Sequence, residues 1–179
     1  MKKILSLFLT AATVLSLTAC GDAESVVLPN SDGYAEGKAG DTMRTCFFDY
    51  TVNSAYLSDS YGGRSADDGC ELLVAEITVK NTTGSSLEMY DSDFQLQWND
   101  SSADAFEYSL TFYDEEDAAP LSDEMLPGIY SLARDESRTG LLVFQIPAGS
   151  GDFSISYQEI FSDESTGDTF FVYFDAKKQ

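Results

Sequence analysis

The sequence contains no histidine. Histidine is the commonest general base near neutral pH, the usual partner of a serine or cysteine nucleophile, and the commonest transition-metal ligand. Its absence therefore removes most hydrolase and zinc mechanisms. Basic residues are also scarce, because 10 Lys and Arg stand against 31 Asp and Glu and give a formal net charge of −21. A surface this acidic repels phosphates, which argues against a nucleic-acid binder and against a domain lying flat on anionic lipid.

The sequence also lacks an apolar run of the roughly 20 residues that span a bilayer as a helix. An uncharged stretch, residues 4–19, follows Lys2 and Lys3 and stops at Cys20. A basic start, an apolar stretch and then small residues are typical of a secretory signal peptide. We therefore predict a signal helix over residues 1–19 that is cleaved from the mature chain.

The residues LTAC at positions 17–20 resemble the lipobox of bacterial lipoproteins. In that motif the cysteine thiol is joined to diacylglycerol, and the peptide bond before the cysteine is then cut. Two acyl chains hold a soluble domain stably at a membrane, whereas one gives only marginal binding. We expect Cys20 to be lipidated and to anchor the chain outside the cell membrane. The alternative is an ordinary signal peptide followed by a stray cysteine.

The start of the mature chain is rich in glycine, small residues and acids. Residues 21–40 read GDAESVVLPNSDGYAEGKAG and show no sustained period. Such composition is typical of a flexible linker, so we predict a tether over residues 20–39. It would hold the domain on the order of 25 Å from the lipid surface.

From residue 41 onward the dominant hydrophobic period is two, and no stretch of ten or more residues shows a helical stripe. Polar turns separate the alternating segments. This pattern predicts about seven or eight short strands in an antiparallel two-sheet β-sandwich over residues 40–175, with a C-terminal tail at 176–179. A small barrel is the alternative. The predicted strand segments are 41–57 (with Cys46, Phe48, Tyr50 and Val52 on one face), 71–80, 93–98, 105–113, 139–147, 152–157 and 169–175.

Several of these segments together resemble a known family. Gly40 to Thr42, FFDYTVNSAYL, LLVAEITVKNTTGSSLEMYDSDFQL and LPGIYSLARDESRTGLLVFQIPAGSGDFSISY are similar to the immunoglobulin-like domain of Gram-positive surface lipoproteins. That domain is similar in fold to telokin and to a secreted mycobacterial immunoprotective antigen. The resemblance covers residues 40–175 and implies an immunoglobulin-like sandwich at a Gram-positive cell surface. It implies no catalytic residue.

Carboxylates are the remaining chemical groups of interest. Asp91 with Asp93, or the run at 114–117, could supply the paired acids of a glycosidase, but adjacent acids are common in so acidic a chain. We expect no enzymatic activity and no cofactor. The acidic turns DEED and SDESTGD could hold calcium, yet neither has the spacing of a known calcium loop, so solvated turns are the expectation. The weak calcium candidates are Asp114, Asp117, Asp163 and Asp168.

With Cys20 lipidated, two cysteines remain. Cys46 and Cys70 form an even pair in an oxidising compartment, so we predict a disulfide between them. A plain hairpin would leave them several residues out of register, and the loop at 58–69 must fold back to join them. Two free thiols are the alternative.

These observations favour a noncatalytic binding or structural module, a monomer tethered to the cell surface through Cys20. The first alternative is a carrier of a small apolar or sugar ligand, and the second is a calcium-dependent adhesion module. A large cleft lined by tyrosine and tryptophan would favour the carrier. A closed core with an exposed apolar patch would favour the binding module.

Overall fold

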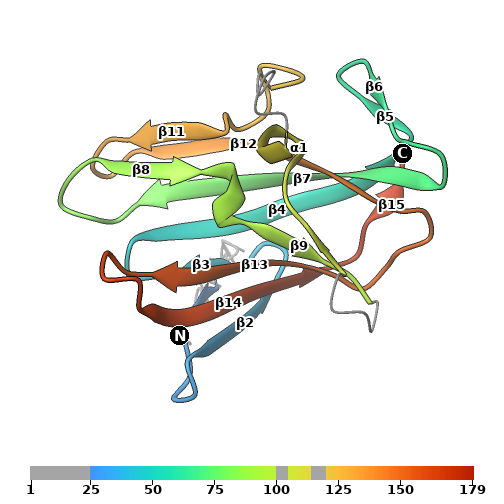
Figure 1. Ribbon diagram of the computed structural model, residues 1–179. Helices are drawn as coiled ribbons and strands as arrows, with labels where there is room; N and C mark the ends of the chain where they lie inside the picture. Colours follow the sequence, from blue (N-terminus) through green and yellow to red (C-terminus); the bar gives the residue numbers. More distant parts are fainter. Residues whose placement is uncertain (1–24, 100–104, 114–119) are drawn as a thin grey trace, which may run out of the picture.

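Two β-sheets make up most of the structure. The computed structural model describes residues 25–99, 105–113 and 120–179. The first sheet has six strands, in the order β1-β3-β4-β7-β12 with β15 beside β4, and the second has five, in the order β10-β9-β13-β14-β2 (Figure 1). The first sheet contains β1 (Val26–Val27), β3 (Thr42–Arg44), β4 (Phe48–Ser58), β7 (Cys70–Asn81), β12 (Ser137–Pro147) and β15 (Lys177–Lys178). The second contains β2 (Tyr34–Lys38), β9 (Gln95–Gln97), β10 (Phe106–Glu107), β13 (Phe153–Ile160) and β14 (Thr166–Phe174).

The two sheets pack face to face around the main core. Alternate side chains of the long strands point inward, as the period of two predicts. The prediction of an all-β, two-sheet sandwich is confirmed. Most neighbouring strands run antiparallel, but β1 is parallel to β3, β2 to β14 and β15 to β4. The inward residues include Phe48, Tyr50 and Val52 of β4, Leu73, Ala75, Ile77 and Val79 of β7, Leu142, Phe144 and Ile146 of β12, Phe153, Ile155 and Tyr157 of β13, and Phe170 and Val172 of β14.

Smaller elements cover the outer side of β7 and β12. Leu72, Val74 and Val143 point away from the main core and pack with Leu110 and Met125. Strand β7 is therefore buried on both faces, which explains its nearly continuous apolar sequence. No helix in the described ranges is long and apolar enough to cross a membrane. The smaller elements are β5 (Ser60–Tyr61), β6 (Arg64–Ser65), β8 (Leu87–Tyr90), the short 3₁₀ helix η1 (Asp91–Asp93), α1 (Leu110–Tyr113) and β11 (Ile129–Leu132).

The segment 105–113 differs from its predicted form, a single strand. Only Phe106–Glu107 is a strand, and the chain then turns into α1. The hydroxyl of Ser109 lies 2.9 Å from that of Thr111, and the Thr111 hydroxyl donates to the carboxylate of Asp91. Such local side-chain bonds compete with the strand ladder, and the alternating apolar pattern cannot reveal them.

The predicted tether is wrong over residues 26–38, because both strands in this range belong to the sandwich. Val26 pairs with Thr42, and β2 pairs along β14. The glycines that suggested a linker have structural roles here: a Cβ on Gly37 would lie 2.8 Å from the sulfur of Met43, and Gly40 has a φ of +90°. Close packing and a left-handed turn both favour glycine.

The sandwich therefore includes strands within residues 26–38 and does not start at residue 40. Six residue steps separate Val26 from Cys20, which can span at most about 20 Å. Residues 1–24 lie outside the described part of the chain, so the signal peptide and the lipidation of Cys20 stay predictions.

The C-terminal residues 176–179 also join the sandwich, contrary to the predicted tail. Ala176 packs against the main core, and Lys177 pairs with Tyr56 of β4. The backbone N–H of Gln179 donates to the carbonyl of Leu57 at 3.0 Å. The sandwich therefore extends to the last residue of the chain.

The predicted disulfide is wrong, because Cys46 and Cys70 are both free and Cys46 is exposed rather than on the inward face. Phe48 pairs with Asn81, the last residue of β7, and Ser58 pairs with Leu72, near the start of β7. Cys46 therefore lies close to the end of β7, whereas Cys70 is its first residue. Ten strand residues separate these positions, on the order of 30 Å. A disulfide requires Cα atoms within about 7 Å.

Residue 35 tests whether β2 belongs to the fold. Ala35 is only 1% exposed. Ala35→Arg should lower the free energy of unfolding by at least about 2 kcal/mol, because the core must accept both extra volume and a charge. The exposed Ala39 provides a matched control, and Ala39→Arg should change stability by less than about 0.5 kcal/mol in urea unfolding. If both variants lost equally little unfolding free energy, residue 35 would not lie in the core and the prediction of a tether would stand.

The cysteines give a second test of the fold. Although the residue is exposed, partial desolvation of its thiol and the nearby Glu159 carboxylate raise the pKa of Cys46 to about 12, which keeps the thiol protonated at neutral pH. We expect a reducing agent to leave the melting temperature unchanged, and we expect residues 46 and 70 to react fully with a thiol reagent after unfolding. The double variant Cys46→Ser/Cys70→Ser serves as the control that cannot respond to reduction. A cross-linked 46–70 peptide in the mass spectrum of the oxidised protein would contradict this expectation.

Candidate functional site

The side of the second sheet that points away from the first sheet carries an unusual set of side chains. The register places Ser156 between Gln95 of β9 and Phe171 of β14, and Ser154 between Gln97 and Tyr173. Strand β2 continues these rows beyond β14. We call this surface the outer face. Its residues are Gln95, Gln97, Ser154, Ser156, Gln158, Thr169, Phe171, Tyr173, Tyr34, Glu36 and Lys38.

Three aromatic rings form one side of the outer face. The rings of Tyr34 and Phe171 lie 6.5 Å apart with their planes 23° apart, and those of Phe171 and Tyr173 lie 6.3 Å apart at 15°. Tyr34 is 51% exposed and Tyr173 is 46% exposed. We call these three residues the aromatic shelf. Its ring planes are nearly parallel, and Phe171, which lies in the middle, is half-buried between the two more exposed tyrosines.

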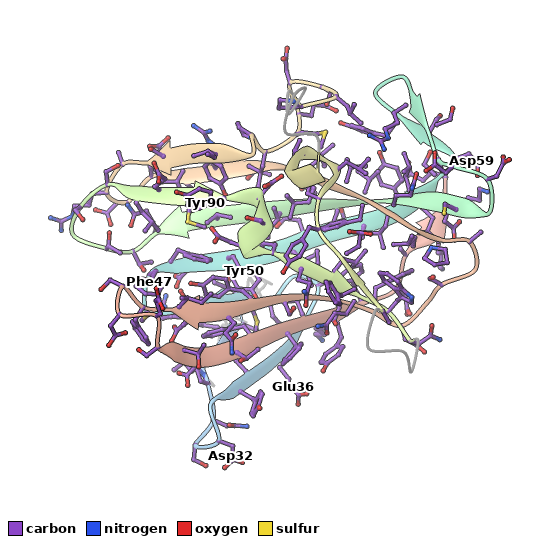
Figure 2. All side chains as sticks on the ribbon, in the orientation of Figure 1. Asp32, Glu36, Phe47, Tyr50, Asp59 and Tyr90 are labelled. Atoms are coloured by element: carbon purple, nitrogen blue, oxygen red, sulfur yellow. The ribbon has the colours of Figure 1, made fainter. Side chains whose placement is uncertain are left out.

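Amides and hydroxyls occupy the middle of the outer face. The Gln97 amide donates to Gln95 Oε1 at 3.0 Å, and the Gln95 amide donates to the Tyr108 hydroxyl at 3.3 Å. These bonds fix the orientation of both glutamines. The outward side chains of β9, β13 and β14 carry no charge, whereas the chain as a whole has 31 acids. Figure 2 shows Glu36 on the edge strand β2 and Asp32 in the turn before it.

A cleft of about 200 Å³ opens at the end of the outer face nearest to η1. The 3₁₀ turn places Asp93 at this cleft, and the backbone N–H of Tyr90 donates to Asp93 Oδ2 at 2.8 Å. The cleft is largely polar, and Gln95, Ser156 and Gln158 belong to both the cleft and the outer face. The lining residues are Ser92, Asp93, Gln95, Tyr108, Ser156, Tyr157, Gln158 and Ile160.

Burial raises the pKa of the Asp93 carboxyl to about 6, and the charge of the neighbouring Asp91 adds to this effect. The hydrogen bond from Tyr90 opposes the rise but does not cancel it. At neutral pH the cleft therefore contains a carboxylate that is poorly solvated and ready to accept hydrogen bonds from a ligand.

The structure places Asp91 and Asp93 in the same turn but in different surroundings. Asp91 is only 2% exposed and accepts a hydrogen bond from the Thr111 hydroxyl. Burial raises its pKa, and hydrogen bonds from Thr111 and others lower it in part. Of the two, only Asp93 lines the cleft. The pair does not form the two facing acids of a glycosidase.

Asp163 and Asp168, the calcium candidates within the described residues, do not form part of a metal cage. Asp163 Oδ1 accepts hydrogen bonds from the hydroxyl and the backbone N–H of Ser165 at 2.6 and 3.1 Å, which lower its pKa. Asp168 donates its backbone N–H to Glu159. Within the described residues, no three His, Cys, Asp or Glu side chains gather to hold a metal ion. Asp114 and Asp117 lie outside those residues, so the expectation of a solvated turn there stays a prediction.

The aromatic shelf is not predicted from the sequence. Tyr34 falls in the predicted tether, and among residues 169–175 the predicted core uses only inward positions such as Phe170 and Val172. A signal was present, because Phe171 and Tyr173 make β14 aromatic on its outward side too. A strand that is apolar on both faces but lies under no other layer points to a binding surface.

The profile of a family described as Domain of unknown function (DUF4352) matches residues 37–166. No curated protein matches the chain.

Solved structures from Gram-positive bacteria share the fold. The candidate lipoprotein ycdA of Bacillus subtilis has a TM-score of 0.54 at 19% identity, and the match covers 75% of this chain but 38% of that protein. The yjhA protein of Bacillus subtilis has a TM-score of 0.53 at 22% identity, covering 76% and 98% of the two chains. A functionally unknown protein from Listeria monocytogenes has a TM-score of 0.53 at 12% identity, covering 77% and 82%. At these identities the likeness shows the fold alone.

The carboxyl at the cleft should make stability depend on pH. The pKa of the Asp93 carboxyl is about 6 in the folded chain and about 3.9 in the unfolded chain. Stability therefore falls as the pH rises from about 3.9 through 6, because the folded state must then ionise a poorly solvated carboxyl. Asp93→Asn retains an oxygen that can accept from Tyr90 and removes this cost. We expect the variant to be more stable than wild type by about 1 to 2 kcal/mol at pH 7.5, with solvent screening allowed for.

Urea unfolding at pH 4 and pH 7.5 measures the effect, and the gain should disappear at the lower pH. Asp32→Asn removes the same charge from an exposed turn and should leave the pH profile of wild type unchanged. A gain of equal size at both pH values would show that Asp93 is not buried as described.

Proposed function

Because the chain belongs to the DUF4352 family, whose description assigns no activity, we propose a function from its own residues: a lipid-anchored, noncatalytic binding module outside the cell. Lipidation at Cys20 would anchor it to the cell membrane of a Gram-positive bacterium, and the sandwich would present its outer face to a partner. The likeness in fold to a candidate lipoprotein of Bacillus subtilis supports the location. The immunoglobulin-like assignment of the sandwich is part of the same proposal.

The observation that carries the proposal is the outer face, where the aromatic shelf and the polar cleft adjoin. Exposed aromatic rings contribute little to folding compared with buried ones, and a half-buried carboxylate lowers stability at neutral pH. Neither feature is explained by the packing of the sandwich. Both are useful to a surface that binds a partner from solution.

The absence of catalysis remains part of the proposal. The sequence has no histidine, and Asp93 lines the described cleft without a second carboxylate. An acid without a facing partner can accept hydrogen bonds from a ligand, but it supplies only half of the usual pair for sugar hydrolysis.

The carrier alternative has less support. Sites that enclose a small molecule usually measure about 300 to 1,000 Å³ and are mostly apolar. The cleft beside Asp93 is about 200 Å³ and more polar than apolar, so a ligand there would extend onto the outer face. A hollow of about 350 Å³ on the outward side of the first sheet is lined mostly by polar and charged residues, and one of about 390 Å³ beside Tyr173 and Phe174 is wide open to solvent, so neither encloses an apolar ligand. This arrangement favours a module that binds part of a larger molecule.

The short link to Cys20 constrains where that molecule lies. At most about 20 Å of chain separates the first strand from the lipidated residue, so the sandwich stays close to the membrane. Its partner would be a component of the envelope in the layer just outside the lipid headgroups.

Two outward threonines provide a matched test. Thr169 lies on the outer face, and Thr78 lies on the outward side of the first sheet; both are half-buried in the interior of a sheet. Full-length protein in detergent would be mixed with washed cell envelopes of Bacillus subtilis and sedimented. Thr169→Arg should reduce co-sedimentation at least tenfold, because it places a long charged side chain among the shelf and the glutamines. Thr78→Arg adds the same charge elsewhere and should bind as wild type does.

Circular dichroism would confirm that both variants fold. Equal binding by both variants would exclude the outer face as the binding surface, and no binding by the wild type would contradict a binding role in the envelope.

A further inference from the structure

The outer face has the chemistry of a surface for sugars. We propose that it binds an uncharged glycan chain of β-linked pyranose rings, which lie on the aromatic shelf while their hydroxyls bond to the glutamines and the cleft. This inference rests on the proposed function and names the class of its ligand.

Charge is the first argument for this ligand. The outward side chains of β9, β13 and β14 are uncharged, although the formal net charge of the chain is −21. The surrounding acids repel polyanions such as nucleic acids and acidic polysaccharides. An uncharged, hydroxyl-rich polymer meets no such repulsion and matches the uncharged strip.

The geometry of the aromatic shelf is the second argument. The equatorial hydroxyls of a glucose-type pyranose leave the two faces of the ring apolar, so such a ring can pack against an aromatic ring. A β-1,4 linkage keeps successive rings in a flat, extended chain, whereas an α-1,4 linkage curves it. Tyr34, Phe171 and Tyr173 provide three such rings, with centroids 6.5 and 6.3 Å apart and planes within 23° of each neighbour. Tyr34 and Tyr173 are about half exposed, so a pyranose ring could pack against either of them.

The polar groups beside the shelf are the third argument. A glutamine amide offers two donors and two acceptor lone pairs, and the described bonds of Gln95 and Gln97 use only part of this capacity. Sugar hydroxyls both donate and accept, so they match amides well. The carboxylate of Asp93 adds an acceptor at the end of the strip, where it would receive hydroxyl protons from the terminal ring.

Polar side chains distinguish this surface from the centre of a protein interface. Such centres are enriched in aromatic residues, methionine and arginine and depleted in serine. The aromatic shelf alone would suit such a centre, but the rest of the outer face consists of three glutamines beside Ser154 and Ser156, which are 5% and 7% exposed. Its polar groups are spaced along the rows of the sheet, which suits a ligand that repeats.

The test is a titration of the full-length protein in detergent with cellohexaose, chitohexaose and maltohexaose, followed by calorimetry. The first two are flat, β-linked chains, and maltohexaose is α-linked and curved. We expect the wild type to bind cellohexaose or chitohexaose and to bind maltohexaose at least tenfold more weakly. Whichever flat chain binds more tightly identifies which sugar the face prefers.

Variants of the shelf separate ring stacking from other effects. Tyr173→Ala should weaken binding at least tenfold, whereas Tyr173→Phe retains the ring and loses only the hydroxyl that donates to Glu36 at 3.2 Å, so its affinity should stay within about threefold of wild type. Phe161, which is 39% exposed after the end of β13 and packs against Phe47, provides a matched aromatic control, and Phe161→Ala should bind as wild type does.

Three results would overturn the inference: equal affinity of Tyr173→Ala and wild type, equal losses in Tyr173→Ala and Tyr173→Phe, or no binding of any of the three oligosaccharides. If no oligosaccharide binds but envelopes still bind and Thr169→Arg abolishes that binding, the glycan assignment fails and the proposed function stands.

Discussion

The alternation of side chains along β13 is the constraint on which the rest of the structure depends. Ile155 and Tyr157 point inward and fill the space between the two sheets, whereas Ser154, Ser156 and Gln158 point outward. One strand therefore builds the core and the middle of the outer face at the same time. A slip of one residue would exchange the two sets and would bury the polar side chains. The apolar core thus fixes the register that aligns the glutamines, serines and aromatic rings into rows.

The cleft depends on a second set of buried polar contacts. The carboxylate of Asp91 accepts a hydrogen bond from the Thr111 hydroxyl, and this bond joins η1 to the start of α1. The η1 turn holds Asp93 at the cleft, where the backbone N–H of Tyr90 donates to its carboxylate. These contacts place a poorly solvated carboxylate beside a neutral strip, at a cost to stability above pH 6. A sandwich without a site would gain stability by losing that charge.

The two main errors of sequence interpretation have a common physical cause. A tether and an edge strand have similar composition, because an edge strand such as β2 buries little and uses small residues where another chain packs closely. Long-range contacts distinguish the two, such as the pairing of β2 with β14 and the approach of Met43 to Gly37. In the same way, the pairing of Cys46 with Cys70 was plausible from their number, but the antiparallel register of β4 and β7 places them at opposite ends of the sheet. The distance between two residues on different strands cannot be predicted from the local sequence around each of them.

The sequence by itself determined the all-β class, most of the long strands and their inward residues, because a period of two is a local property that follows from strand geometry. It also determined the acidity of the surface and the lack of histidine chemistry. Only the tertiary structure decided where the domain begins, that 105–113 turns into α1, and which outward residues adjoin. Tyr34 and Phe171 are far apart in the chain and meet because β2 pairs in parallel with β14. A surface assembled from several strands depends on their order and register, and long-range packing sets both.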